Sequence, residues 1–259
     1  MSNGIEDYLF DLRGYIQINQ AINNSLLQKL NCIINTYSNL KPGEWKGWVH
    51  RPNNPNDIIH LHNLFEMGEE FETLIDHPSW IERVRHYVGR DDGLFIDESF
   101  VDIRNRGGTT RIHSGAHKRR IRTQFRYHNG EFRCGQINVL IALNDIGEGD
   151  GATMVVPGSH KSNLLHPAIR AKVSSLDDVE GAIELRLKAG DAAMFVDCLA
   201  HGSARRIHPG QRRILIIRYG PHWGNNRYGY QPSSELVSRL TNERRAIIQP
   251  LSPLLPPSN

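Results

Sequence analysis

The feature that most constrains the fold of this chain is a succession of short apolar segments between residues 94 and 219, separated by turn residues. One separator, Asn129-Gly130, is the dipeptide preferred in two-residue hairpin turns. Many short strands joined by turns form a sandwich or a barrel. We therefore expect a mainly β core, a double-stranded β-helix (jelly roll, cupin-like), over about residues 93–220. Its expected strands are residues 94–103, 121–128, 131–143, 153–156, 183–187, 192–196 and 213–219.

Residues 1–92 have a different pattern, in which apolar side chains recur at helical spacing. The apolar residues between Leu26 and Ile34 predict a helix that begins at Ser25. The chain is predicted to be a single domain, residues 1–259, in which this helical portion packs on the outside of the jelly roll and a helical tail follows. The other expected elements are helices over residues 66–75, 78–88 and 233–248, a strand over residues 8–18, and an irregular segment over residues 45–62.

The composition excludes some classes of protein. Charged residues make up 23% of the chain and the formal net charge is +3, which does not indicate binding to a nucleic-acid polymer. No apolar stretch approaches the roughly 20 residues that span a bilayer, and no signal-peptide pattern is visible. The 3 cysteines include no CxxC pair, as in reduced intracellular proteins. We therefore expect a cytoplasmic protein that acts on a small molecule, and nothing predicts its oligomeric state.

Two histidines, His113 and His201, lie near opposite ends of the β region, and Arg212 lies at the start of the strand that follows the second. This is the layout of a mononuclear iron site on a β-barrel. Imidazole suits Fe(II), and an open-sided iron centre takes two histidines and one carboxylate. The position two residues after His113, where a carboxylate would complete that set, is Gly115.

Five short motifs follow one another through the middle and last thirds of the chain. They are residues 142–145 (ALND), 151–161 (GATMVVPGSHK), 188–192 (KAGDA), 201–203 (HGS) and 212–219 (RRILIIRY). None is specific alone. The ordered set resembles the phytanoyl-CoA dioxygenase family of Fe(II)/2-oxoglutarate-dependent oxygenases, which implies a jelly-roll enzyme that uses Fe(II), 2-oxoglutarate and O2.

The resemblance also implies roles for individual residues. His201 matches the distal iron ligand, and His113 stands where the proximal ligand is expected, with His117 as the alternative in a shifted register. Arg212 matches the arginine that pairs with the far carboxylate of 2-oxoglutarate, since a planar guanidinium binds a carboxylate bidentately. Ser203 matches a hydroxyl that contacts the same carboxylate.

Gly115 departs from the family pattern, because hydroxylating members usually read His-x-Asp where this chain reads His-Ser-Gly. A glycine there is similar to the halogenase variation, in which a chloride or bromide replaces the missing anion and the product carries halogen instead of hydroxyl. The leading prediction is therefore a halogenase that acts on an aliphatic C–H bond. The alternatives are a hydroxylase whose carboxylate comes from Glu98, Asp102 or Asp197, and a jelly roll that binds a ligand without catalysis.

A cationic run, residues 118–122, lies beside His113. Its arginines could contact an anionic substrate such as a nucleotide, a phosphate or an acyl-carrier group, or could form a solvated surface. The candidate substrate residues are Arg119, Arg120 and Arg122. Four other residues are expected to be structural or solvated: His160, His208, Cys134 and Cys198.

Overall fold

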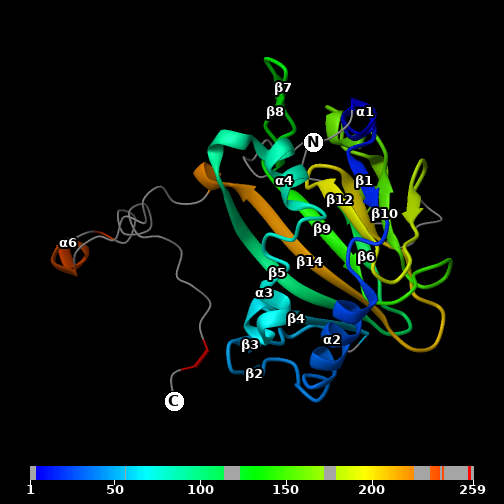
Figure 1. The fold of residues 1–259 in the computed structure, drawn as a ribbon, viewed down its shortest axis with the longest axis vertical. Helices are drawn as coiled ribbons and strands as arrows, with labels where there is room; N and C mark the ends of the chain where they lie inside the picture. The colour runs from blue at the N-terminus through cyan, green and yellow to red at the C-terminus, as the bar shows by residue number, and fades with distance from the viewer. Residues whose placement is uncertain are drawn as a thin grey trace.

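The computed structural model describes residues 4–55, 57–113, 123–171, 179–224 and 234–239, together with residues 241 and 256–257. Within them, the chain forms two antiparallel sheets and a small hairpin of β7 (Tyr127–His128) and β8 (Glu131–Phe132) (Figure 1). The large sheet has the order β1 (Tyr15–Ile18), β12 (Ala192–Val196), β9 (Ile137–Ala142), β14 (Arg212–Pro221), β5 (Leu94–Arg104), β4 (Ile58–His62), β3 (Val49–His50), β2 (Trp45–Lys46). The small sheet has the order β11 (Ile183–Leu185), β10 (Thr153–Val156), β13 (Ala200–Ser203), β6 (Thr110–His113).

The chain crosses repeatedly between the sheets, from β9 in the large one to β10 in the small one, then from β12 to β13 and back to β14. That path is the jelly-roll topology, so the predicted mainly β fold with flanking helices is confirmed. Alternate residues of each strand point to opposite faces. On the large sheet, Val101, Leu215 and Ile141 lie side by side on three neighbouring strands, and their side chains are fully buried in the core. The residues before and after each of them along its strand face the other sheet.

Helices complete the described chain. α2 (Asn24–Asn35) is capped by the side chain of Asn23, which accepts from the Leu26 N–H, and it buries Leu30 and Ile34. α4 (Ile81–Val88) contacts β9 and β14. The other helical elements are α1 (Gly4–Arg13), η1 (Leu64–Met67), α3 (Glu69–Glu72), η2 (Arg90–Asp92), η5 (Ser159–Lys161), α5 (Pro167–Arg170), η6 (His222–Gly224) and α6 (Ser234–Arg239).

Two predictions for the first 92 residues are wrong in part. The expected strand over residues 8–18 is helical as far as Arg13; Gly14, at φ 82°, then turns the chain into the shorter strand β1. The expected irregular segment 45–62 contains β2, β3 and β4. Its last strand pairs with β5 over five residues, so backbone hydrogen bonding to a long central strand overrides a sequence with little strand character.

The predicted hairpin turn at Asn129-Gly130 is confirmed, but the long strand expected over residues 131–143 is interrupted. Between β8 and β9 the backbone turns to other partners: the Cys134 N–H donates to Tyr87 O and the Gly135 N–H donates to Gln124 O. The helix expected over residues 66–75 is reduced to η1 and α3, and the one expected from Pro78 begins at Ile81.

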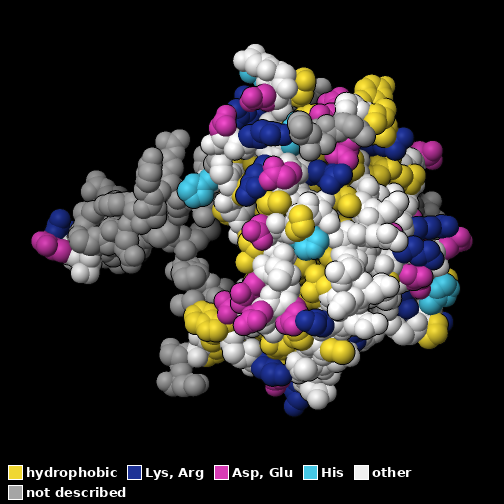
Figure 2. Space-filling view, in the orientation of Figure 1, with side chains coloured by type: hydrophobic (Ala, Val, Ile, Leu, Met, Phe, Trp, Pro, Cys, Tyr) yellow, Lys and Arg dark blue, Asp and Glu magenta, His cyan; other side chains and the backbone are white. Residues whose placement is uncertain are grey.

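The described surface carries charges of both signs. On the face shown in Figure 2, lysine and arginine side chains of the described residues are interspersed with aspartate and glutamate side chains. No helix in the described part of the chain combines the length and the apolar character that a membrane crossing requires.

Candidate active site

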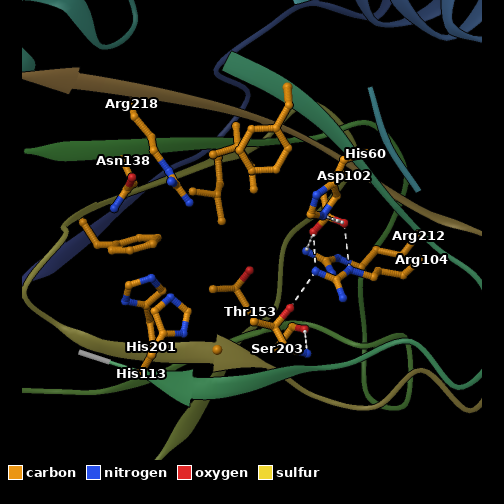
Figure 3. Close-up of a pocket in the computed structure, with 16 residues that line it drawn as sticks. His60, Asp102, Arg104, His113, Asn138, Thr153, His201, Ser203, Arg212 and Arg218 are labelled. Carbon is orange, nitrogen blue, oxygen red and sulfur yellow. Dashed lines mark hydrogen bonds and ion pairs between the residues drawn. The ribbon is translucent and has the colours of Figure 1, made fainter. Parts of the chain in front are cut away.

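A pocket of about 170 Å³ opens between the two sheets, which is room for a small organic acid (Figure 3). Figure 3 shows His113 and His201 at one end and a cluster of Asp102, Arg104 and Arg212 at the other. Three strands of the large sheet line the pocket with residues from one of their faces: Phe100, Asp102 and Arg104 from β5, Asn138 and Leu140 from β9, and Arg212, Ile216 and Arg218 from β14.

His113 and His201 face each other from β6 and β13 at directly opposite register positions, with ring centroids 4.1 Å apart. In each ring Nδ1 bonds the carbonyl oxygen two residues earlier, at 2.9 Å from Arg111 O and 2.7 Å from Leu199 O. Because a carbonyl only accepts, each ring carries its proton on Nδ1 and its lone pair on Nε2. This is how histidines that bind metals are commonly oriented.

The two rings differ in their exposure to solvent. His113 is exposed, whereas His201 is buried. Burial, helped by the neighbouring His113, holds the pKa of His201 well below its ordinary value. His201 is therefore neutral at pH 7, and only the neutral ring has a lone pair for a metal.

Gly202 allows the two histidine-bearing strands to approach each other. A Cβ atom there would lie 2.7 Å from Thr110 O and 3.1 Å from Ile112 N, both on β6. Backbone atoms cannot move aside as a flexible side chain can, so any larger residue would push β6 away from β13 and separate the histidines.

We expect Gly202→Ala to lower the stability of the fold by about 1–3 kcal/mol, the usual cost of overpacking, and to weaken metal binding. Thermal unfolding and the affinity for Ni(II) measure the two effects. Gly4→Ala is a matched control, because a Cβ at Gly4 meets nothing within 4 Å. If Gly202→Ala bound the metal as the wild type does, the spacing of β6 and β13 would not be what pairs the histidines.

The other end of the pocket contains buried charges. Arg104, Arg212 and Asp102 are 4%, 1% and 2% exposed. Arg104 bonds Asp102 through two nitrogens, at 2.7 and 3.1 Å, and Arg212 Nη2 lies 3.5 Å from Asp102 Oδ2. Nε and Nη1 of Arg212 are buried and have no hydrogen-bond partner in the described part of the chain. Unpaired buried donors are costly, and such groups in a folded protein point to a ligand or an ordered water.

The ionisation of this cluster follows from its surroundings. Burial alone would raise the pKa of Asp102, but the charge of Arg212, the neighbouring His60 and Arg104 outweigh it and hold the pKa below its ordinary value. Burial lowers the pKa of Arg212 to about 10, against the opposing effect of Asp102. Both groups are charged at pH 7, so the arginine can still bind an anion.

Ser203 lies between the two ends. Its Oγ accepts a hydrogen bond from the Thr110 N–H at 2.8 Å, and it lines the pocket beside Thr153. A hydroxyl that accepts one bond can still donate its own proton, so Ser203 can donate to an anion in the pocket. The structure thus brings together four predicted residues: His113, His201, Ser203 and Arg212.

The alternative iron carboxylates are engaged elsewhere. Glu98 pairs with Arg218 at 2.6 Å, Asp102 lies among the arginines, and Asp197 accepts a hydrogen bond from Asn138. Within the described ranges, no three His, Cys, Asp or Glu side chains form a group that could hold a metal ion. Other predicted site residues lie outside these ranges and stay predictions: Gly115, His117, Arg119, Arg120 and Arg122.

Arg104, His60 and Asn138 line the pocket although the sequence did not mark them. A signal for Arg104 exists, because Asp102 and Arg104 alternate with the apolar Val101 and Ile103. His60 has no comparable signal, since it comes from the segment that was expected to be irregular. His160, Cys134 and Cys198, which were expected to be structural, are buried, and His208, which was expected to be solvated, is exposed.

The donor sets fit the groups that the iron-site layout implies. The histidines present two lone pairs to one end of the pocket, and imidazole suits Fe(II). Buried unpaired guanidinium nitrogens at the other end fit a carboxylate. Leu140, Ile216 and Phe100 separate the two ends with apolar surface, so a short molecule with a different polar group at each end matches the pocket.

Comparison with known proteins agrees with this geometry. The family model described as phytanoyl-CoA dioxygenase (PhyH) matches residues 10–214. "Dioxygenase cdmD" of Talaromyces verruculosus is 29% identical over 106 residues, which cover 40% of this chain and 33% of that protein. "Dioxygenase FUM3" of Gibberella moniliformis is 30% identical over 82 residues, or 32% of this chain and 24% of that protein. The matches thus span a third or less of these relatives.

Two solved structures resemble the fold over most of the chain. HygX from Streptomyces hygroscopicus, with nickel and 2-oxoglutarate bound, has a TM-score of 0.74 at 20% sequence identity. The superposition covers 91% of this chain and 94% of HygX. The non-heme alpha ketoglutarate dependent epimerase SnoN has a TM-score of 0.59 at 14% identity, with 87% of this chain and 89% of that one covered. At these identities the likeness shows a common fold.

Proposed function

The chain belongs to the phytanoyl-CoA dioxygenase family, and from that premise we propose that it is an Fe(II)/2-oxoglutarate-dependent oxygenase that oxidises an aliphatic C–H bond of a small molecule. One observation carries the proposal. A single pocket has two facing histidines at one end and a buried arginine with unpaired N–H groups at the other. A protein that only binds a ligand has no need for that combination.

In this proposal His113 and His201 hold Fe(II) through their Nε2 atoms. Arg212 binds the far carboxylate of 2-oxoglutarate, and the Ser203 hydroxyl donates to it. Iron held there would activate O2, which is the oxidant both for the C–H bond and for the conversion of 2-oxoglutarate to succinate and CO2. Leu140 and Ile216 keep water away from the stem of the cosubstrate.

The experiment that tests this function is the conversion of 2-oxoglutarate to succinate by the purified protein with Fe(II) and O2. Oxygenases of this kind turn over slowly without their substrate, so a sensitive product assay is enough. Succinate that depends on both iron and His201 supports an enzyme. Binding of 2-oxoglutarate without any succinate, under all conditions, would favour the non-catalytic jelly roll.

Hydroxylation is the outcome that the relatives favour, since those compared are named dioxygenases. Halogenation is the second candidate, and Gly115 is the specific observation in its favour. Without a carboxylate at that position, iron would have two neutral imidazoles and the 2-oxo acid, so an added anion such as chloride or bromide would restore the missing negative charge.

The halide proposal predicts a difference between the wild type and Gly115→Asp. In the anaerobic protein with Fe(II) and 2-oxoglutarate, chloride should change the visible absorption of the wild type and leave Gly115→Asp unchanged, because a carboxylate would exclude the halide. With substrate and O2, the wild-type product should show the isotope pattern of chlorine. A hydroxylated product alone, at every chloride concentration, would rule out halogenation.

The substrate side of the pocket is proposed to include Arg218 and Asn138, which face the histidines from the large sheet (Figure 3). The substrate is proposed to be a small molecule, and the structure of HygX with hygromycin B bound is an example in that protein. The cationic residues Arg119, Arg120 and Arg122 remain candidates for binding an anionic group. Their attraction should weaken at high ionic strength, because salt screens exposed charges.

A further inference from the structure

The arginine end of the pocket has an excess of positive charge. Arg104 and Arg212 are directly opposite each other on β5 and β14 and face the same pocket. Like charges at directly opposite positions of a sheet destabilise it. Both are nearly inaccessible to solvent, so water does not screen their repulsion.

A single carboxylate compensates these two cations in the described part of the chain. Asp102 bonds Arg104 through two nitrogens and pairs with Arg212 at 3.5 Å. His60 lies 3.5 Å from Asp102 and can only add positive charge. Among the described residues, one positive charge therefore remains buried without a carboxylate partner.

The unpaired donors lie on both arginines. Arg104 uses Nε and Nη2 for Asp102, and Nη2 also donates to Thr110 Oγ1 at 2.7 Å. Its Nη1 is buried without a hydrogen-bond partner among the described residues, as are Nε and Nη1 of Arg212. One carboxylate has about four lone-pair sites and a charge of −1, so it can accept from an unpaired nitrogen of each arginine and cancel the excess charge.

We infer that Arg104 is a second cosubstrate-binding residue, and that the far carboxylate of 2-oxoglutarate is held by Arg104 and Arg212 together, with Asp102 keeping both guanidinium groups in place. The inference rests on the proposed function, because it takes 2-oxoglutarate as the ligand. It gives Arg104 the specific task of discriminating a dicarboxylate from a 2-oxo acid that has an apolar far end.

The test compares two ligands of equal length. 2-Oxoglutarate has a carboxylate where 2-oxopentanoate has a methyl group, and the end that chelates the metal is the same. Dissociation constants of both are measured on the full-length, Ni(II)-loaded protein by titration calorimetry, for the wild type, Arg104→Gln, Arg104→Lys and Arg213→Gln. Arg213 is a matched control, since it is the neighbour of Arg212 on β14 and bonds Gln211 and Asn31 instead of lining the pocket.

Wild type and Arg213→Gln should prefer 2-oxoglutarate strongly. In Arg104→Gln that preference should fall by about tenfold or more, through weaker binding of 2-oxoglutarate alone. Arg104→Lys keeps the positive charge but lacks the planar pair of N–H donors, so its preference for 2-oxoglutarate should lie between those of the wild type and Arg104→Gln. An unchanged preference in Arg104→Gln would overturn the inference, as would equal losses for both ligands, which indicate a purely structural role. A wild type that binds neither ligand would overturn the proposed function itself.

Discussion

Replacing His201 with alanine is expected to remove the metal from the protein and to abolish its iron-dependent turnover of 2-oxoglutarate. His201 is buried, neutral and oriented by the bond from Nδ1 to Leu199 O, so its lone pair is already directed for binding. Loss of a residue that merely orients a ligand costs about 10–100-fold in metal affinity or activity. Loss of the ligand itself should cost more. Metal content after dialysis against Fe(II), and succinate formation, measure the effect.

Two further variants make this result specific. His208→Ala is the control, because His208 is exposed and bonds Asp150 on a loop outside the pocket. It should keep the wild-type metal content. His113→Ala should behave as His201→Ala does. If His113→Ala retained iron and turnover, the second ligand would have to be His117, and the cross-strand pair would not be the metal site.

Replacing Arg212 with alanine is expected to weaken the binding of 2-oxoglutarate severely. Truncating one partner of a buried, hydrogen-bonded charge pair costs about 2–5 kcal/mol, which is roughly 30-fold to several thousand-fold in the dissociation constant. The protein should still fold, because Asp102 keeps its two bonds to Arg104. The measurement is the dissociation constant of 2-oxoglutarate on the metal-loaded variant, with circular dichroism to verify the fold.

The neighbouring arginine provides the comparison for this variant. Arg213 lies on the opposite face of β14, where it bonds Gln211 and Asn31, and Arg213→Ala should leave the affinity near that of the wild type. An Arg212→Ala protein with unchanged affinity would contradict the assignment. The carboxylate would then be bound by another cation of the pocket, either Arg104, which lies directly opposite Arg212, or Arg218.

The jelly roll and the residues of its site were predictable where a periodic pattern or an ordered motif carries the information. Strands such as β9, whose residues are all buried, are apolar throughout and stand out in the sequence. His201, Ser203 and Arg212 belong to motifs in a fixed order. His201 and Ser203 are alternate residues on one face of the small sheet, and Arg212 faces the same pocket from the large sheet.

Other features depend on contacts that no local pattern encodes. The strand β4 forms because β5 offers it a free edge, and it carries His60 to the pocket. Arg104 becomes important only when β5 and β14 are in register, which places it opposite Arg212. Asp102, which was considered as an iron ligand, pairs with Arg104 and Arg212 instead, because the same register places it beside them. Register between distant strands, rather than residue type, decides these roles.

The most direct test of the proposed function is an anaerobic titration of the Fe(II)-loaded protein with 2-oxoglutarate. A 2-oxo acid that chelates Fe(II) produces a visible charge-transfer absorption, and this signal requires neither oxygen nor the unknown substrate. We expect the absorption to appear in the wild type and to saturate at one 2-oxoglutarate per chain, to be absent in His201→Ala, and to require far more 2-oxoglutarate in Arg212→Ala. A wild-type protein that binds Fe(II) but develops no such absorption at saturating 2-oxoglutarate would contradict the assignment of this pocket.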